Sequence, residues 1–398
     1  MFGSGVGQSH IFSVFISPIS EDLGISRTSV STAYAAATLV AAFGLPYTGR
    51  LVDRFGVRAV LVGIAVLLGF AAIGFANVGG MLALGLGFAA LRFLGQGSLM
   101  LCCNNLVSQW FSRKRGFALS LMALGFALSM ALHPPFAQWL NASFGWRGAW
   151  MWLAVITWLL LLPPVLLLVI HKPEEIGLEP DGKAAEESGD AEERARHSAR
   201  AGLTLAQALR TSAFWVIAFG LSTLSMLVTA LFFHQVSIFE TQGISREIAA
   251  RIFPISAVTM VAVMPLFGRA LDRFRPRWVF AVALLTMTLS LVMVTFVRDL
   301  TTAVVYAIVF GVNNAAIHTH FTFMWPRFFG RRHLGSIQGA GQTIAVVGAS
   351  LGPLPFGIAF DLYGSFEGAL LLFALQPLVA AVLVVFLRPP RLADYAEQ

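Results

Sequence analysis

The chain has 398 residues, of which 57% are hydrophobic and only 12% are charged. Soluble domains carry about 25% charged residues, so this composition excludes an ordinary water-soluble domain and indicates a protein that is solvated by lipid. The formal net charge of +7 does not indicate a nucleic-acid partner, because the basic residues lie in short loops between apolar segments. The two cysteines, Cys102 and Cys103, are adjacent within an apolar stretch, so neither a disulfide framework nor a metal site is expected.

Apolar stretches of about 20 residues recur along the chain, and this is the length that an α-helix needs to cross a bilayer. The sequence therefore predicts an all-α membrane protein with twelve transmembrane helices. In chain order, the expected spans cover residues 1–19, 29–48, 58–77, 80–109, 116–138, 148–170, 212–237, 248–267, 278–296, 301–325, 335–358 and 367–387. They form an N-terminal six-helix bundle at 1–170 and a C-terminal six-helix bundle at 211–388, followed by a tail at 389–398.

The segment 171–210 between the bundles is polar and rich in Glu, Ala and Arg. It has too few large apolar residues to form a core, so we expect a linker. If the N-terminus is cytoplasmic, the loops and tail on that side hold 21 of the 27 Lys and Arg residues. The positive-inside rule then predicts an inner-membrane protein whose linker and two termini are all cytoplasmic.

An internal repeat divides the chain into two homologous halves. The segment Gly49–Arg58 recurs, altered, as Gly268–Arg277, and the same offset of 219 residues aligns Gly24–Arg27 with Gly243–Arg246. Such a repeat in an apolar chain is typical of secondary transporters built from two pseudo-symmetric bundles. At this offset Met1 aligns with a residue well inside the seventh span, so the first helix is expected to be truncated at its cytoplasmic end.

The loop between the second and third spans carries a further signature, which reads Gly-Arg-Leu-Val-Asp-Arg-Phe-Gly-Val-Arg. It resembles the pattern Gly-x-Leu-x-Asp-Arg-x-Gly-x-Arg of the major facilitator superfamily, and the resemblance extends over the whole chain. It implies the major facilitator fold and a gating latch, in which the Asp caps a neighbouring helix and pairs with Arg. The implied latch residues are Gly49, Asp53, Arg54, Gly56 and Arg58, with a degenerate second copy at Asp272, Arg273 and Arg277. Alternatively, these charges only orient the helices in the membrane.

Other segments resemble the bacterial monocarboxylate and oxalate–formate antiporter branch of this superfamily. They include Arg92-Phe-Leu-Gly-Gln-Gly, Phe144-Gly-Trp-Arg and Phe328-Phe-Gly-Arg-Arg-His. The eighth span departs from animal monocarboxylate carriers, which place an Asp and an Arg there; this chain has neither between Ser256 and Pro265.

Arg92 is the one Lys or Arg expected deep inside a span rather than near its end. It lies about 18 Å along the fourth helix, near the membrane midplane. A cation at this depth costs at least about 2.5–3.5 kcal/mol, so it needs a partner. No Asp or Glu falls in the interior of the expected spans, since Glu367 is the first residue of the last one. This leaves two hypotheses. Arg92 binds an anionic substrate, or it bonds backbone carbonyls and buried polar groups as a packing element.

Polar residues in the first and tenth spans complete the predicted substrate site: Gln8, His10, Asn313 and Asn314. The resemblance implies that these spans, with the fourth and the seventh, line a central cavity. Histidine titrates near neutral pH, so His10 and His234 are the candidates for proton coupling. No metal or other cofactor is expected at these residues.

The sequence thus predicts a secondary active transporter for a small organic anion, with a carboxylate as the expected class. Transport would proceed by rocker-switch alternating access, with proton symport or exchange of two anions as the coupling. The resembled family implies a monomer. One alternative is an exporter of amphipathic drugs, in which Arg92 is structural; another is a membrane sensor. No nucleotide-binding loop or nucleophile–base pair indicates an enzyme.

Overall fold

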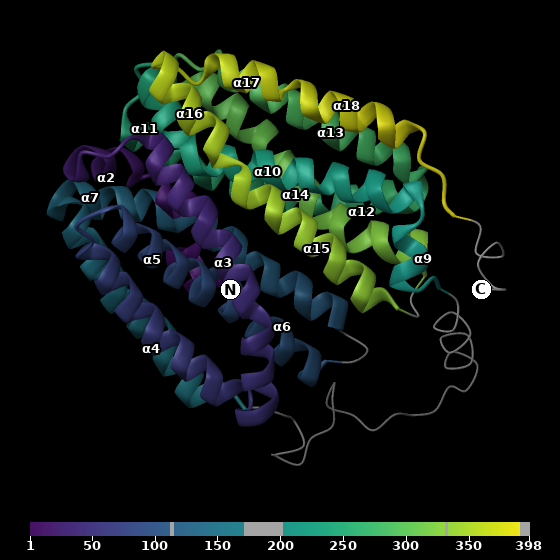
Figure 1. Cartoon of the computed structure of the whole chain (residues 1–398), viewed down its shortest axis with the longest axis horizontal. Helices are drawn as coiled ribbons and strands as arrows, with labels where there is room; N and C mark the ends of the chain where they lie inside the picture. The colour runs from purple at the N-terminus through teal and green to yellow at the C-terminus, as the bar shows by residue number, and fades with distance from the viewer. Residues whose placement is uncertain (112–114, 171–201, 331–332, 391–398) are drawn as a thin grey trace.

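The computed structural model describes residues 1–111, 115–170, 202–330 and 333–390 (Figure 1). Most of the predicted linker and tail therefore lies outside the described residues. The N-terminal half comprises η1 (Phe2–Gly7), α1 (Ser9–Phe12), α2 (Ile16–Leu23), α3 (Arg27–Phe55), α4 (Val57–Ala76), α5 (Met81–Leu91), η2 (Arg92–Ser98), α6 (Leu99–Trp110) and α7 (Arg115–Leu168). The C-terminal half comprises α9 (Leu205–Leu209), α10 (Ser212–Thr241), α11 (Arg246–Arg251), α12 (Phe253–Arg273), α13 (Pro276–Val294), α14 (Leu300–Phe329), α15 (Leu334–Leu351), α16 (Pro353–Tyr363), α17 (Glu367–Phe373) and α18 (Leu375–Val385).

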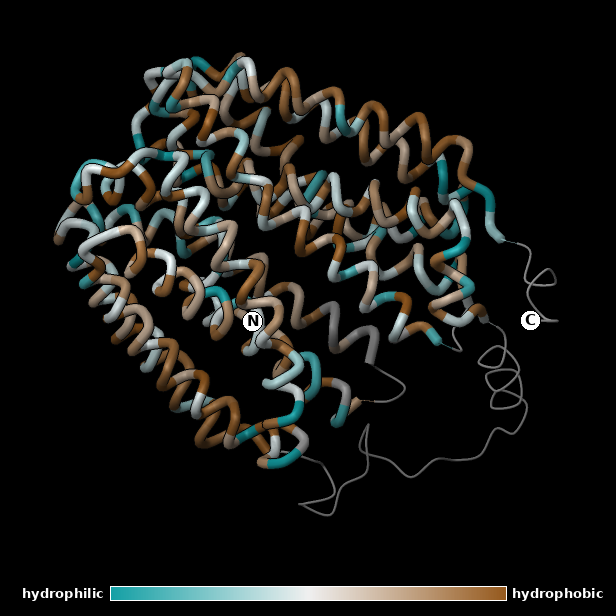
Figure 2. Tube along the Cα trace, in the orientation of Figure 1, coloured by the Kyte–Doolittle hydropathy of each residue, from teal (hydrophilic) through white to brown (hydrophobic). Residues whose placement is uncertain are grey.

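The described residues confirm the expected all-α membrane class. Ten helical segments are long and apolar enough to cross a bilayer, and one of them, Leu121–Leu168, contains two helices that meet at Gly145. Apolar residues run along these helices in Figure 2. The first expected span differs from the rest, because residues 1–23 form three short helices rather than one long one.

Backbone turns at matching positions support the internal repeat. Gly24 and Gly243 both have positive φ, at 62° and 80°, and Gly145 and Gly364 do so at 69° and 67°. Each pair is separated by the repeat offset, and glycine adopts this conformation without steric cost. The two halves thus reverse the chain with the same local geometry at two equivalent positions.

We call the two ends of the bundles the linker end and the far end. The linker end is where α7 finishes at Leu168 and α10 starts at Ser212. At the far end, α2, α11 and the junction of α16 with α17 lie together, on the left and top of Figure 1. The described hydrogen bonds between the two halves gather toward the far end, for example from Ser17 to Glu240 and from Thr28 to Asp361.

Candidate functional site

Arg92 lies at the start of η2, a π-helical turn between α5 and α6. Its side chain is 3% exposed. Nε donates to Oγ1 of Thr38 at 3.1 Å, Nη1 donates to the carbonyl of Gly7 at 3.1 Å, and the guanidinium lies 5.0 Å from the centre of the Tyr34 ring. These partners carry no formal charge, so they hold Arg92 in place without neutralising it.

A close approach of two helices brings the Gly7 carbonyl to Arg92. A side chain at Gly95 would place its Cβ 2.9 Å from the Gly7 Cα, and one at Gly7 would meet the Leu91 carbonyl oxygen at 2.4 Å. Only glycine permits such contact between backbones. Nothing in the sequence had connected Arg92 with Gly7, Thr38 or Tyr34.

His10 lies where the two halves meet. Its ring packs edge-on against Phe126 of α7 and Phe232 of α10, each with centroids 5.9 Å apart. Phe126 also contacts the exposed His318 of α14, with ring centroids 5.5 Å apart. Arg92 is bonded to Gly7, three residues before His10. We refer to His10, Phe126, Phe232 and His318 as the central seam. The seam combines aromatic faces with imidazole groups and is contributed by both bundles.

The remaining predicted binding residues are not brought to Arg92 by direct contact. The Gln8 amide donates to Ser4 at 3.2 Å. Asn313 donates to Ser290 of α13 at 2.6 Å, and its oxygen accepts from Thr286 at 3.1 Å. Asn314 donates to the carbonyl of Phe310 at 2.9 Å, within α14 itself. These contacts are the helix-packing bonds expected inside a bundle.

His234, the second candidate for proton coupling, lies at another contact between the halves. Its Nε2 is 2.9 Å from the Pro353 carbonyl and 3.5 Å from Oγ of Ser31, which belongs to the N-terminal half. Its Nδ1 is buried and has no hydrogen-bond partner among the described residues. Movement of the halves would therefore change the surroundings of this imidazole.

The predicted latch is only partly visible. Gly56 ends α3 with φ 78°, whereas its repeat partner Arg275 has φ −63°, so the second copy has lost this turn. Arg58 donates to the Leu166 carbonyl, and Arg54 lies over the neighbouring Phe55 ring. The Asp53 side chain lies outside the described part of the structure. Gly49 lies in α3, and Asp272 and Arg273 are exposed at the end of α12. The latch stays a prediction.

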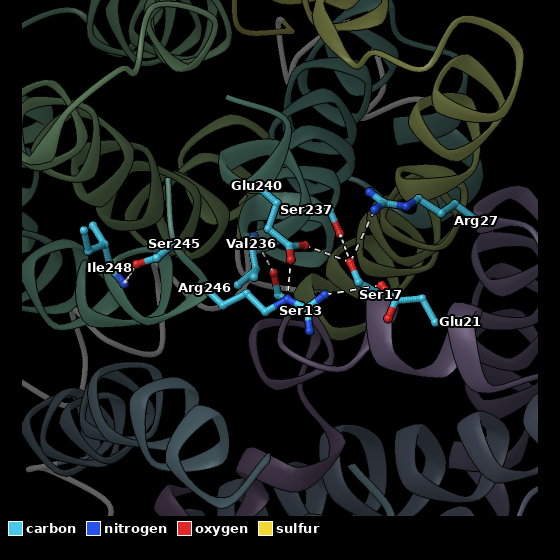
Figure 3. A network of polar contacts seen from close by, with 10 residues as sticks. All are labelled: Ser13, Ser17, Glu21, Arg27, Val236, Ser237, Glu240, Ser245, Arg246 and Ile248. Carbon is cyan, nitrogen blue, oxygen red and sulfur yellow. Dashed lines mark hydrogen bonds and ion pairs between the residues drawn. The ribbon is translucent and has the colours of Figure 1, made fainter. Parts of the chain in front are cut away.

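A polar cluster at the far end joins the halves, and the sequence did not predict it (Figure 3). We call it the clasp. Its members are Ser13, Ser17, Glu21, Arg27, Glu240 and Arg246, which Figure 3 labels, together with Asp361. Ser17 donates to Glu240 at 2.8 Å, and Arg246 forms ion pairs with Glu240 and, at 3.4 Å, with Glu21.

The clasp has further bonds around this core. Ser13 accepts from the backbone N–H of Val236 at 3.0 Å, and Arg27 donates to Ser17 at 3.3 Å. Asp361 accepts from the backbone N–H groups of Arg27 and Thr28 at 3.2 and 2.7 Å, capping α3 from the other half.

The expected ends of the seventh and eleventh spans, at 237 and 358, were too early, so Glu240 and Asp361 lie within the spanning helices after all. The seventh helix continues to Thr241, past its apolar stretch, and the eleventh span includes Asp361. The repeated Gly-Ile-Ser-Arg motif marked this region, because it contains both Arg27 and Arg246. Composition alone could not pair these arginines with acids on other helices.

Two cavities lie away from the central seam. One, of about 330 Å³, lies at the far end and includes Gln242, Arg298 and Glu367; the other, of about 470 Å³, lies at the linker end and includes Arg277 and Arg388. Among the described residues, no group of three or more His, Cys, Asp or Glu side chains could hold a metal ion.

Comparisons with known proteins give the family. A family model described as Major Facilitator Superfamily matches residues 1–353, with a second match over 234–397. The oxalate:formate antiporter of Oxalobacter formigenes is 28% identical over 174 residues, which cover 43% of this chain and 40% of that protein. The 4-hydroxybenzoate transporter of Pseudomonas putida is 32% identical over 165 residues, covering 40% and 35%. The chain thus spans less than half of each of these two relatives.

The fold also matches a solved structure. A bacterial homologue of the human lysosomal transporter Spinster, in an inward-facing and unoccupied conformation, superposes with a TM-score of 0.73 at 12% identity, covering 97% of this chain and 94% of that one. At this identity the match establishes the arrangement of helices.

Proposed function

The chain belongs to the major facilitator superfamily and is a membrane transporter rather than an enzyme; from this premise we propose that it moves a small organic anion, of the carboxylate class, across the inner membrane. The observation that carries the proposal is the buried Arg92, whose described partners are all uncharged. A cation held without a counter-charge near the midplane attracts an anion in this low-dielectric region.

We place the cargo at the central seam. His10 and His318 offer imidazole groups from opposite bundles, Phe126 and Phe232 offer apolar faces, and Arg92 is bonded to Gly7, three residues before His10. Gln8, Asn313 and Asn314 remain candidate ligands for another conformation, because here their amides bond within their own bundles. The names of the two carboxylate-transporting relatives agree with an anionic cargo.

The clasp supports alternating access. It joins the halves at the far end, which the positive-inside distribution would place outside the cell, with both termini cytoplasmic. We therefore assign the structure to an inward-facing state, in which the clasp blocks the outer route. Opening outward requires the Glu21–Arg246 and Ser17–Glu240 contacts to break. Coupling to protons through His10 or His234, and a monomeric state, belong to the same proposal.

The test is ligand-induced stabilisation followed by uptake. Purified protein is heated with oxalate, formate, 4-hydroxybenzoate or hydrophobic cations, and the stabilising compound is then measured in proteoliposomes. A ligand at 100 times its Kd adds roughly 2.7 kcal/mol of stability. We expect a carboxylate to stabilise the wild type, Arg92→Lys to weaken the effect and Arg92→Ala to abolish it. Arg298→Ala, which removes a cation at the far end, is the matched control.

The amphipathic exporter remains the second candidate, because the central seam is rich in aromatic rings. Stabilisation by hydrophobic cations alone, unchanged in Arg92→Ala, would select the exporter and leave Arg92 as a packing element. Normal transport of an identified anion by both Arg92 variants would place the anion site elsewhere.

A further inference from the structure

A cavity of about 470 Å³ opens at the linker end of the C-terminal half. Its walls come from the start of α13, the end of α14 and the segment that follows α18. The lining residues are Arg275, Pro276, Arg277, Arg327, Phe328, Leu387, Arg388 and Pro389. Half of them are arginines, and they come from three separate segments, so the fold brings the charges together rather than the local sequence.

The cavity has a surplus of positive charge. Within the described part of the chain, none of its four arginines forms an ion pair. The Arg277 Nε is buried and has no hydrogen-bond partner there. The α13 helix also begins at Pro276, so the positive end of its dipole points to the same place. Guanidinium groups in this arrangement suit the oxygens of a phosphate group.

Exposed apolar side chains continue from the cavity along two packed helices. Trp278, Val282 and Leu285 are exposed on α13, and Val382 and Phe386 are exposed on α18 and at its end. Thr288 of α13 donates a hydrogen bond at 3.2 Å to the carbonyl of Ala374, the residue directly before α18. Trp278 follows Arg277 directly, and tryptophan is enriched where the headgroup region meets the hydrocarbon. The surface therefore offers cations at the headgroup level and apolar side chains below them.

We propose that this cavity binds the phosphate headgroup of an anionic phospholipid, whose acyl chains lie along α13 and α18. The arginines supply the phosphate contacts, and the apolar strip distinguishes a lipid from a free phosphate ion. Basic pockets between transmembrane helices bind headgroups of this kind. The site is separate from the central seam and does not depend on the identity of the cargo.

The experiment uses the full-length protein in detergent, stripped of lipid. It is titrated with phosphatidylglycerol, phosphatidylcholine or inorganic phosphate, and bound lipid is counted by native mass spectrometry alongside the melting temperature. The test variant is Arg275→Gln/Arg388→Gln, whose side chains are exposed. The control is Arg50→Gln/Arg269→Gln, which removes two exposed charges at the same end of the helices but outside the cavity.

We expect phosphatidylglycerol to bind and stabilise the wild type and the control, and the test variant to bind it roughly thirtyfold more weakly, from about 1 kcal/mol for each charge removed. Arg388→Gln alone, in the segment that follows α18, should show an intermediate loss and serves as the test if the double variant folds poorly. Equal binding by the test and control variants would overturn the site. If inorganic phosphate stabilised the protein as much as phosphatidylglycerol does, the ligand would be a free phosphate rather than a lipid. If phosphatidylcholine bound as tightly as phosphatidylglycerol, the site would not recognise the negative charge of the lipid.

Discussion

Glu21 and Glu240 occupy the same position in the two repeats, 219 residues apart, and both carboxylates contact the guanidinium of Arg246. The repeat partner of Arg246 is Arg27, which joins the same cluster through Ser17. The clasp therefore contains both copies of one glutamate and one arginine position, and Arg246 pairs with Glu240 in its own half and with Glu21 in the other half. Because the Glu21–Arg246 pair crosses between the halves, separation of the halves at this end must break it.

Removal of the Arg246 charge should weaken the clasp. Exposed ion pairs each contribute about 0.2–1 kcal/mol, and the Arg246 side chain is 32% exposed. We therefore expect Arg246→Gln to shift the equilibrium toward the outward-open state by about 1 kcal/mol, or roughly fivefold. A Ser17→Cys/Ser237→Cys pair reports the closed state, because the two hydroxyl oxygens are 3.5 Å apart. Disulfide formation should slow in Arg246→Gln.

The control for this measurement is Arg251→Gln, an exposed residue of the same short helix that forms no ion pair among the described residues. Both variants are made with Cys102 and Cys103 replaced by Ala, so that only the new pair reacts. Equal crosslinking rates in Arg246→Gln and Arg251→Gln would show that the ion pairs do not hold the halves together.

The contact between Gly7 and Gly95 should not tolerate a methyl group. In Gly95→Ala the new Cβ would lie 2.9 Å from the Gly7 Cα, and overpacking of this kind costs about 1–3 kcal/mol. The same shift would move the Gly7 carbonyl away from Arg92. Thermal unfolding of the purified protein measures the loss. Gly63→Ala is the control, since a Cβ added there would meet no described atom within 4 Å. Equal melting temperatures for Gly95→Ala and Gly63→Ala would refute the close contact.

The sequence was sufficient for features that repeat or depend on local chemistry. The 219-residue offset predicted two equivalent halves, and the paired turns at Gly24 and Gly243 agree with it. Glycine lies at two positions, Gly95 and Gly352, where a side chain would meet the backbone of another helix. These features follow from residue size and backbone conformation, which the sequence states directly.

Contacts between distant helices could not be predicted in this way. Arg92 was expected to need a partner, but nothing in its helix indicates Thr38 or Gly7, which lie 54 and 85 residues away. Glu240 was missed because the apolar stretch that predicted the seventh span ends at residue 237, whereas α10 continues to Thr241. Asn313 is a polar residue of the kind expected to line the cavity, yet its amide donates to Ser290 of α13. Which face of a helix meets which neighbour is set by packing, and a single sequence does not state it.

His234 should take part in proton coupling, because its surroundings depend on both halves. A neutral imidazole protonated at Nε2 can donate to the Pro353 carbonyl at 2.9 Å. Ser31, 3.5 Å from the same nitrogen, belongs to the other half, so opening of the clasp would remove this neighbour and admit water. A proton could then be exchanged on the outer side only in the open state.

We therefore expect His234→Gln to retain exchange of the anion across proteoliposomes but to lose accumulation driven by a pH gradient. His320→Gln is the matched control, since this histidine is also buried but bonds to the Ala316 carbonyl of its own helix at 2.8 Å. The comparison separates coupling from stability, because both variants remove a buried imidazole while only one alters a contact between the halves. If His234→Gln still accumulated the anion in response to a pH gradient, His234 would not carry the coupling proton. The proton site would then be His10, whose Nε2 lies 3.5 Å from Oγ of Ser129, or the protein would exchange two anions.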